Sequence, residues 1–155
     1  MLKEKRELTQ SFINILEGQE INISAASTKI EKGDIYWDYK TENKPLDLYA
    51  MDEEELQNLL DELSSYVLDE LKREYVGKEI SLLDLDNNMQ QLLNLGDKES
   101  IFNYDTREYL KDSFCYQYQD NPAGAGTGFN FEFKIVKDNE DTTKIIVKVI
   151  DITEV

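Results

Sequence analysis

The apolar stripe over residues 53–75 constrains the fold more than any other feature of the sequence. Leucine and valine recur there at helical spacing, at Leu56, Leu59, Leu60, Leu63, Val67 and Leu71. This spacing predicts one long amphipathic helix whose apolar face packs on a core. Asp52 is a good N-cap, Glu55 completes a capping-box pattern, and Gly77 marks the expected end.

Further helices and strands are expected on both sides of this helix. Helical spacing of apolar residues predicts helices over 2–17, about 82–95 and, more weakly, about 98–112. Alternation with a period of two predicts strands over 21–30, 35–39, 114–119, 129–135 and 143–152, with a further short strand at 46–50. Because the strands cluster at the two ends with helices between them, we expect an α+β fold. One antiparallel sheet of N- and C-terminal strands would carry the N-terminal helix and two to three central helices.

The length of 155 residues predicts a single domain, 1–155, with enough chain for a core. Its apolar runs are far shorter than the ~20 residues that span a bilayer. The charged residues 1–7 precede no apolar stretch of the kind found in signal peptides. We therefore expect a cytoplasmic protein without membrane contact, located in the host cytoplasm if it is phage-encoded.

The charge and residue content exclude several function classes. Asp and Glu number 33 against 17 Lys and Arg, a formal net charge of −16, so phosphates are repelled and direct nucleic-acid binding is not expected. The chain has no histidine and one cysteine, which removes His-based catalysis, His metal sites and intrachain disulfides. We expect no catalytic residues, no metal and no cofactor.

Three local motifs suggest a ligand site, but the residues around each of them do not fit such a site. The glycines of 120–128 precede a predicted strand, whereas a phosphate loop needs a helix N-terminus after it. Residues 84–88 resemble the start of a calcium loop, but Met89 replaces its glycine and Leu95 its glutamate. Cys115 has no neighbouring cation to activate its thiol and is expected to be packed.

The acidic segment 34–62 is the most informative part of the chain. It holds ten acidic residues and two lysines, a net charge of −8, half of the chain's excess in under a fifth of its length. On the expected long helix, acids away from the apolar stripe form two columns, Glu55, Glu62 and Asp69 beside Glu54 and Asp61. Two interpretations stay open: a solvated face that keeps the protein soluble, or a carboxylate array that fits a basic groove made for phosphates.

Aromatic residues accompany these acids, with Tyr36, Trp37 and Tyr39 around Asp38. Consecutive side chains of a strand point to opposite faces, so one face here is expected to be partly exposed. Tyr and Trp are favoured anchors of protein interfaces, although a sheet packed on both sides would make them ordinary core. The candidate partner-binding residues are Tyr36, Trp37, Asp38, Tyr39, Asp52, Glu54, Glu55, Asp61, Glu62 and Asp69.

In charge and size the chain resembles small acidic inhibitors. These include phage anti-defence proteins, among them anti-CRISPRs and other DNA mimics, and immunity proteins that neutralise a basic nuclease toxin. The resemblance implies a non-enzymatic inhibitor whose partner is a nuclease or nucleic-acid-guided effector with a basic surface. The first alternative is a phage or bacterial structural or assembly adaptor that forms a homo-oligomer through an apolar strand edge at 129–152. The second is an enzyme with a carboxylate or tyrosine site near 120–128.

Overall fold

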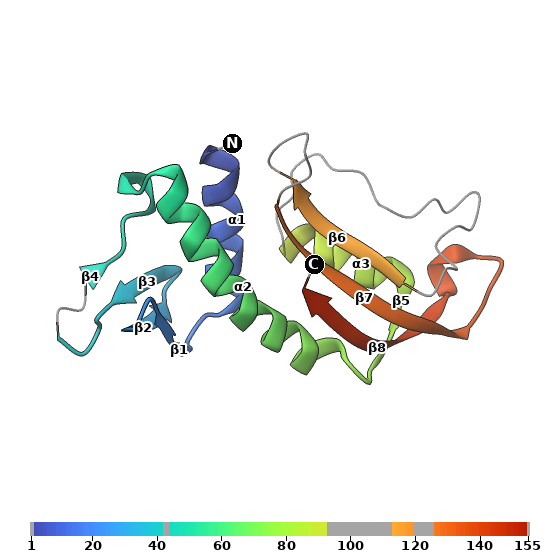
Figure 1. Ribbon diagram of the computed structural model, residues 1–155. Coiled ribbons are helices and arrows are strands. Elements are labelled where there is room, and N and C mark those ends of the chain that lie inside the picture. The colour runs from blue at the N-terminus through green and yellow to red at the C-terminus, as the bar shows by residue number, and fades with distance from the viewer. Residues whose placement is uncertain (1, 42–43, 93–112, 120–125, 155) are drawn as a thin grey trace. The chain divides into compact units, whose positions relative to one another are not determined.

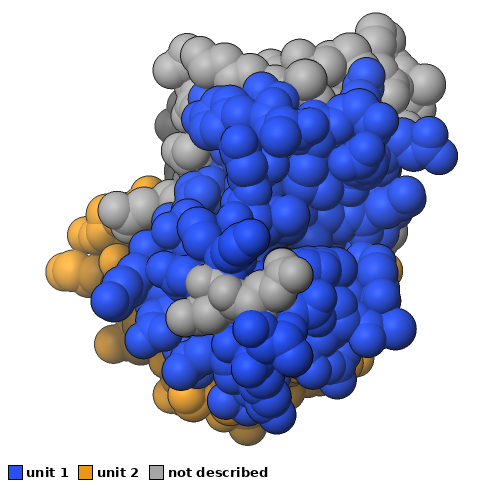
Figure 2. All heavy atoms as spheres, turned by 90° about the vertical axis from the view of Figure 1, so that its left-hand side faces the viewer, with its two compact units in different colours: residues 1–67 blue, residues 68–155 orange. Residues whose placement is uncertain are grey.

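The computed structural model describes residues 2–41, 44–92, 113–119 and 126–154 (Figure 1). The chain divides into two compact units, residues 1–67 and 68–155, which are coloured separately in Figure 2. The first unit contains α1 (Leu2–Ile15), β1 (Glu20–Ile23), β2 (Ala26–Glu31), β3 (Asp34–Trp37), β4 (Lys44–Pro45), the short 3-10 helix η1 (Leu48–Ala50) and most of α2 (Glu53–Tyr75). The second contains the end of α2, β5 (Glu79–Ser81), α3 (Leu82–Leu92), β6 (Ser113–Gln119), β7 (Gly126–Lys137), η3 (Thr142–Lys144) and β8 (Ile146–Glu154).

The first unit is a small antiparallel sheet packed with two helices. Its strands follow the order β1-β2-β3-β4, so each strand pairs with its neighbour in sequence. The buried side chains come from α1, from the sheet and from the apolar stripe of α2, and include Leu8, Phe12, Leu16, Ile23, Ile30, Ile35, Leu56, Leu59 and Leu63. The expected long helix is confirmed at Glu53–Tyr75, and its stripe is buried as the spacing predicts.

Two tight turns fold this sheet. Ser24 (φ 48°) and Ala25 (φ 63°) are both left-handed, so β1 and β2 form a hairpin where the sequence predicts one strand over 21–30. Lys32 (φ 55°) and Gly33 (φ 77°) make the second turn, between β2 and β3. Successive positive φ values are typical of type I′ hairpin turns. The first turn contains no glycine, and this is why the expectation of one strand is wrong.

The connection from β3 to α2 also differs from its expected form. Asp38 is left-handed (φ 49°), so β3 ends at Trp37 rather than at residue 39. The strand expected at 46–50 is the 3-10 helix η1 instead. Asp47 caps η1, because its carboxylate accepts a hydrogen bond from the Tyr49 N–H at 2.9 Å.

The second unit is built on another antiparallel sheet, in the order β5-β8-β7-β6. Alternate residues of β7 and β8 form its core, among them Phe129, Phe131, Phe133, Val147, Val149 and Ile152. Tyr75, at the end of α2, packs edge-on against Phe131 with ring centroids 6.5 Å apart. The weak helix expected at 98–112 and most of the loop expected at 120–128 lie outside the described residues.

The α+β class with antiparallel strands is confirmed, together with the N-terminal helix. The N- and C-terminal strands do not join in one sheet, however, but form a separate sheet in each unit. Sequential strands joined by tight turns close with little loss of chain entropy, which favours this local pairing. Within the described ranges, no helix is both long enough and apolar enough to cross a membrane.

Candidate functional site

The negative charge of the first unit is concentrated in one segment. Residues 1–67 contain fifteen acidic and seven basic residues, a net charge of −8. Residues 1–33 contain five of each, so the whole of this excess falls in 34–62. Several exposed carboxylates of that segment lie at the start of α2, and another lies about two turns further along the helix. We call Asp52, Glu54, Glu55 and Asp61 the acidic face.

Helix geometry explains part of this acidic face. Asp52 is the N-cap of α2, since its carboxylate accepts a hydrogen bond from the Glu55 N–H at 2.8 Å. Carboxylates in the first turn also interact favourably with the positive end of the helix dipole. The neighbouring Glu53 is used internally, 3.4 Å from the ammonium of the buried Lys5 on α1. The N-cap, the helix dipole and the contact with Lys5 thus explain several of these acidic residues without a binding partner.

The acids nevertheless repel one another. The charge of Asp52 raises the pKa of Glu55 above its ordinary 4.5, with smaller contributions from desolvation, a side-chain hydrogen bond to Asp52 and the charge of Glu54. The fold therefore holds the Glu55 carboxylate close to like charges at the start of α2, and this proximity disfavours its ionised form. A cation placed here would relieve that repulsion.

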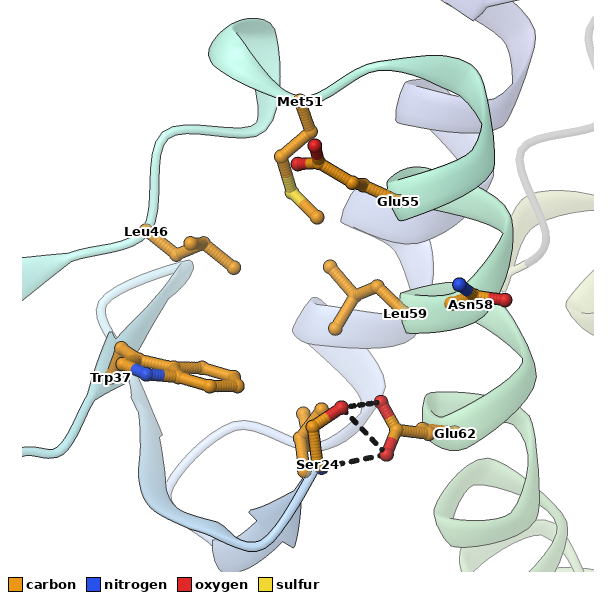
Figure 3. Close-up of a pocket in the computed structure, with 9 residues that line it drawn as sticks. Ser24, Trp37, Leu46, Met51, Glu55, Asn58, Leu59 and Glu62 are labelled. Atoms are coloured by element: carbon orange, nitrogen blue, oxygen red, sulfur yellow. Dashed lines mark hydrogen bonds between the residues drawn. The ribbon is translucent and has the colours of Figure 1, made fainter.

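A pocket of about 320 Å³ opens in the first unit beside the acidic face (Figure 3). It brings together three of the residues that the sequence nominates, Trp37, Glu55 and Glu62. The remaining lining residues are Ile23, Ser24, Leu46, Met51, Asn58 and Leu59. The sequence does not reveal these six, because they come from β1, its turn, the segments before and after η1, and α2, and share no sequence pattern.

Glu62 also has a structural partner in this pocket. Its carboxylate accepts a hydrogen bond from the Ser24 N–H at 2.6 Å and lies 2.9 Å from the Ser24 hydroxyl (Figure 3). The second hairpin turn is held in the same way, since the Glu17 carboxylate accepts from the N–H groups of Lys32 and Gly33. A carboxylate on or beside a helix thus fixes both the β1–β2 turn and the β2–β3 turn.

The other nominated residues lie elsewhere. Tyr36 is on the opposite face of β3 from Trp37, and Asp38 forms the left-handed turn that ends the strand. Tyr39 lines a second, polar pocket of about 290 Å³, with the Lys40 ammonium 5.6 Å from its ring. Asp69 is exposed on the part of α2 that belongs to the second unit. None of these four lines the pocket that contains Trp37.

A search for groups of three or more potential metal ligands finds none among the described residues. Comparison with protein-family models, with curated proteins and with solved structures gives no match. The acidic face and the pocket beside it are the features of the described residues that bear on function.

Proposed function

We propose that this chain is a non-enzymatic inhibitor that binds the basic surface of a nuclease or another nucleic-acid-binding protein. It would act by nucleic-acid mimicry, as phage anti-defence proteins or toxin-immunity proteins do. The acidic face and Trp37 would make the contact, and no cofactor would take part. A negative surface attracts a basic partner over long range, and a buried aromatic anchor slows release.

One observation carries this proposal: the first unit's entire charge excess lies in the segment that also supplies Trp37 and most of the residues that line the pocket. A surface selected only for solubility usually intersperses both signs of charge. Residues 1–33 of the same unit follow that mixed pattern, whereas residues 34–62 do not.

The alternative, an assembly adaptor, loses part of its support. This alternative expects self-association through a strand edge at 129–152. However, β7 pairs with both β6 and β8 and is therefore not an edge strand. β5 and the two residues before it cover β8 from Ile146 to Val149, so among the described residues the open edge of β8 begins at Ile150. Among the described residues, the strand edge expected at 129–152 is thus limited to part of β8, and self-association through it stays a prediction.

The test is capture of partners from the lysate of the native host, first at about 0.1 M and then at about 1 M salt. Exposed charges interact over ~10 Å at the lower concentration and ~3 Å at the higher one. A basic nucleic-acid-binding protein should be retained at low salt and released at high salt. Recovery of the chain alone, or of virion components only, would favour the adaptor.

Two matched triple variants make the test specific to the acidic face. E54Q/E55Q/D61N removes three charges from it and keeps Glu62, because Glu62 holds the first turn. E79Q/E132Q/E140Q removes three exposed charges from the second unit. Capture should be lost in the first variant and kept in the second. Equal capture by both variants would contradict the proposed surface.

A further inference from the structure

The pocket of the first unit combines an apolar lining with acidic groups. Trp37 and Leu46 point towards Leu59, while Met51 and Glu55 lie next to each other at one end (Figure 3). Its volume of about 320 Å³ is at the small end of ligand sites, which run from ~300 to ~1,000 Å³. This size suits one inserted side chain or a small molecule better than a large cofactor.

The charges of the pocket select the kind of occupant. Its two ionisable lining residues, Glu55 and Glu62, are both acidic and lie seven residues apart on α2, about 10.5 Å along the helix axis. A neutral or anionic occupant would leave both carboxylates without a counter-charge. The complementary ligand is a cation with an apolar stem, because such a stem packs on apolar walls while its charge remains beside polar groups.

Arginine fits this description better than lysine. Its guanidinium is less strongly hydrated than an ammonium, stacks on aromatic faces and bonds carboxylates through two parallel N–H groups. The chain already contains one such contact, since the guanidinium carbon of Arg6 lies 4.7 Å from the centre of the exposed Tyr49 ring. The Glu62 carboxylate, although bonded to Ser24, still has lone pairs to offer.

We propose that this pocket receives an arginine side chain of the basic partner, an inference that rests on the proposed function. The methylene stem would pack among Trp37, Leu46 and Leu59. The guanidinium would bond the carboxylate of Glu55, while Glu62, held by Ser24 at the other end of the pocket, would add its negative charge. The pocket would thus be the anchoring point of the interface, and the exposed acidic face would supply the long-range attraction.

Trp37 provides a direct readout, because it is the chain's single tryptophan. The probe is a blocked Gly-Arg-Gly peptide titrated into the full-length chain, followed by tryptophan fluorescence. The matched control peptide replaces arginine by citrulline, which has nearly the same shape but no charge. We expect a saturable change with the arginine peptide in the millimolar range, and at least tenfold weaker binding of the citrulline peptide.

Two neighbouring variants locate the site. Glu55→Gln removes a carboxylate that lines the pocket, and Glu54→Gln removes one that does not. We expect Glu55→Gln to weaken the arginine peptide about five- to tenfold, since a charge-assisted hydrogen bond is lost. Glu54→Gln should weaken it less than about twofold. Equal effects of the two variants would overturn the inference in favour of a diffuse charge effect.

The same titration separates this inference from the proposed function. If no saturable change occurs while the host partner is still captured through the acidic face, the arginine pocket is overturned and the inhibitor proposal stands. If the arginine peptide binds as expected but the lysate yields no basic partner, the pocket is an arginine site whose occupant is not the proposed partner, and the inhibitor proposal is overturned. Failure of both experiments overturns both.

Discussion

The carboxylate of Glu62 accepts a hydrogen bond from the backbone N–H of Ser24, across 38 residues of sequence, at 2.6 Å. Ser24 is the first residue of a turn in which two successive non-glycine residues are left-handed. The carboxylate therefore satisfies a turn amide and ties the β1–β2 hairpin to α2. An acid that sequence analysis nominates for partner binding is at the same time part of the fold.

Replacement of Glu62 by alanine should therefore lower stability. The turn would lose a charged acceptor near the surface, and we expect a loss of about 1 kcal/mol in the free energy of unfolding. Asp61→Ala is the control, because among the described residues the Asp61 carboxylate accepts a hydrogen bond only from the Gln57 side chain, and the bond from the Ser64 hydroxyl goes to the Asp61 backbone carbonyl, which alanine keeps. It should cost less than about 0.5 kcal/mol. Urea denaturation of both variants measures the difference, and equal costs would contradict the structural role of Glu62.

Ala25→Gly should stabilise the chain. Ala25 has a φ of 63°, a conformation that costs an L-residue with a Cβ roughly 1 kcal/mol and costs glycine almost nothing. Part of that gain is offset by the greater freedom of glycine in the unfolded chain, so we expect a net gain of about 0.5 kcal/mol. Ala26→Gly, one residue later and inside β2, should destabilise instead. A lower Tm for Ala25→Gly than for the unaltered chain would contradict the left-handed turn.

Glu55→Gln should raise the Tm at neutral pH. Like charges, Asp52 foremost, raise the folded-state pKa of Glu55 above 4.5, so ionisation of Glu55 reduces stability as the pH rises through that value. The glutamine variant never ionises and keeps the stability of the protonated state. Its advantage should be present at pH 7 and disappear below about pH 4. A Tm gain that is the same at both pH values would rule out charge repulsion as its cause.

Asp141→Asn should show the opposite pH dependence. Hydrogen bonds from the Thr143 hydroxyl and N–H lower the pKa of Asp141 below its ordinary 3.8, with a smaller effect from the charge of Lys144. The stability that this carboxylate contributes is present above that value and is lost as the pH falls through the lowered pKa. The variant should melt earlier than the parent at pH 7 and together with it near pH 2. If the two proteins still differed in Tm at pH 2, the shape of the Asp141 side chain, not its charge, would be what matters.

The elements with strong periodicity could be predicted from the sequence. The stripe from Leu56 to Leu71 and its cap at Asp52 define α2, and the alternation of Phe129, Phe131 and Phe133 defines β7. Their existence and buried faces follow directly from local patterns of side chains, although β7 runs from Gly126 to Lys137 and is longer than the strand predicted over 129–135.

The features that depend on tertiary contacts could not be predicted. The turn at Ser24 and Ala25 lacks the usual glycine and is held by Glu62, which is remote in sequence. The division into two sheets depends on which strands pair, and alternation alone does not specify partners. The pocket itself could not be predicted: the sequence nominates Trp37 and two acids that line it for partner binding, but Leu46, Met51 and Leu59 look like ordinary apolar positions.

Competition with nucleic acid tests the central claim most directly. The captured basic partner would be loaded with a fluorescently labelled nucleic acid that it binds, and the chain would be titrated at about 0.1 M salt. We predict displacement of the nucleic acid by the unaltered chain and by E79Q/E132Q/E140Q, and none by E54Q/E55Q/D61N. A stable complex of chain, partner and nucleic acid together would contradict the claim that the acidic face occupies the nucleic-acid site.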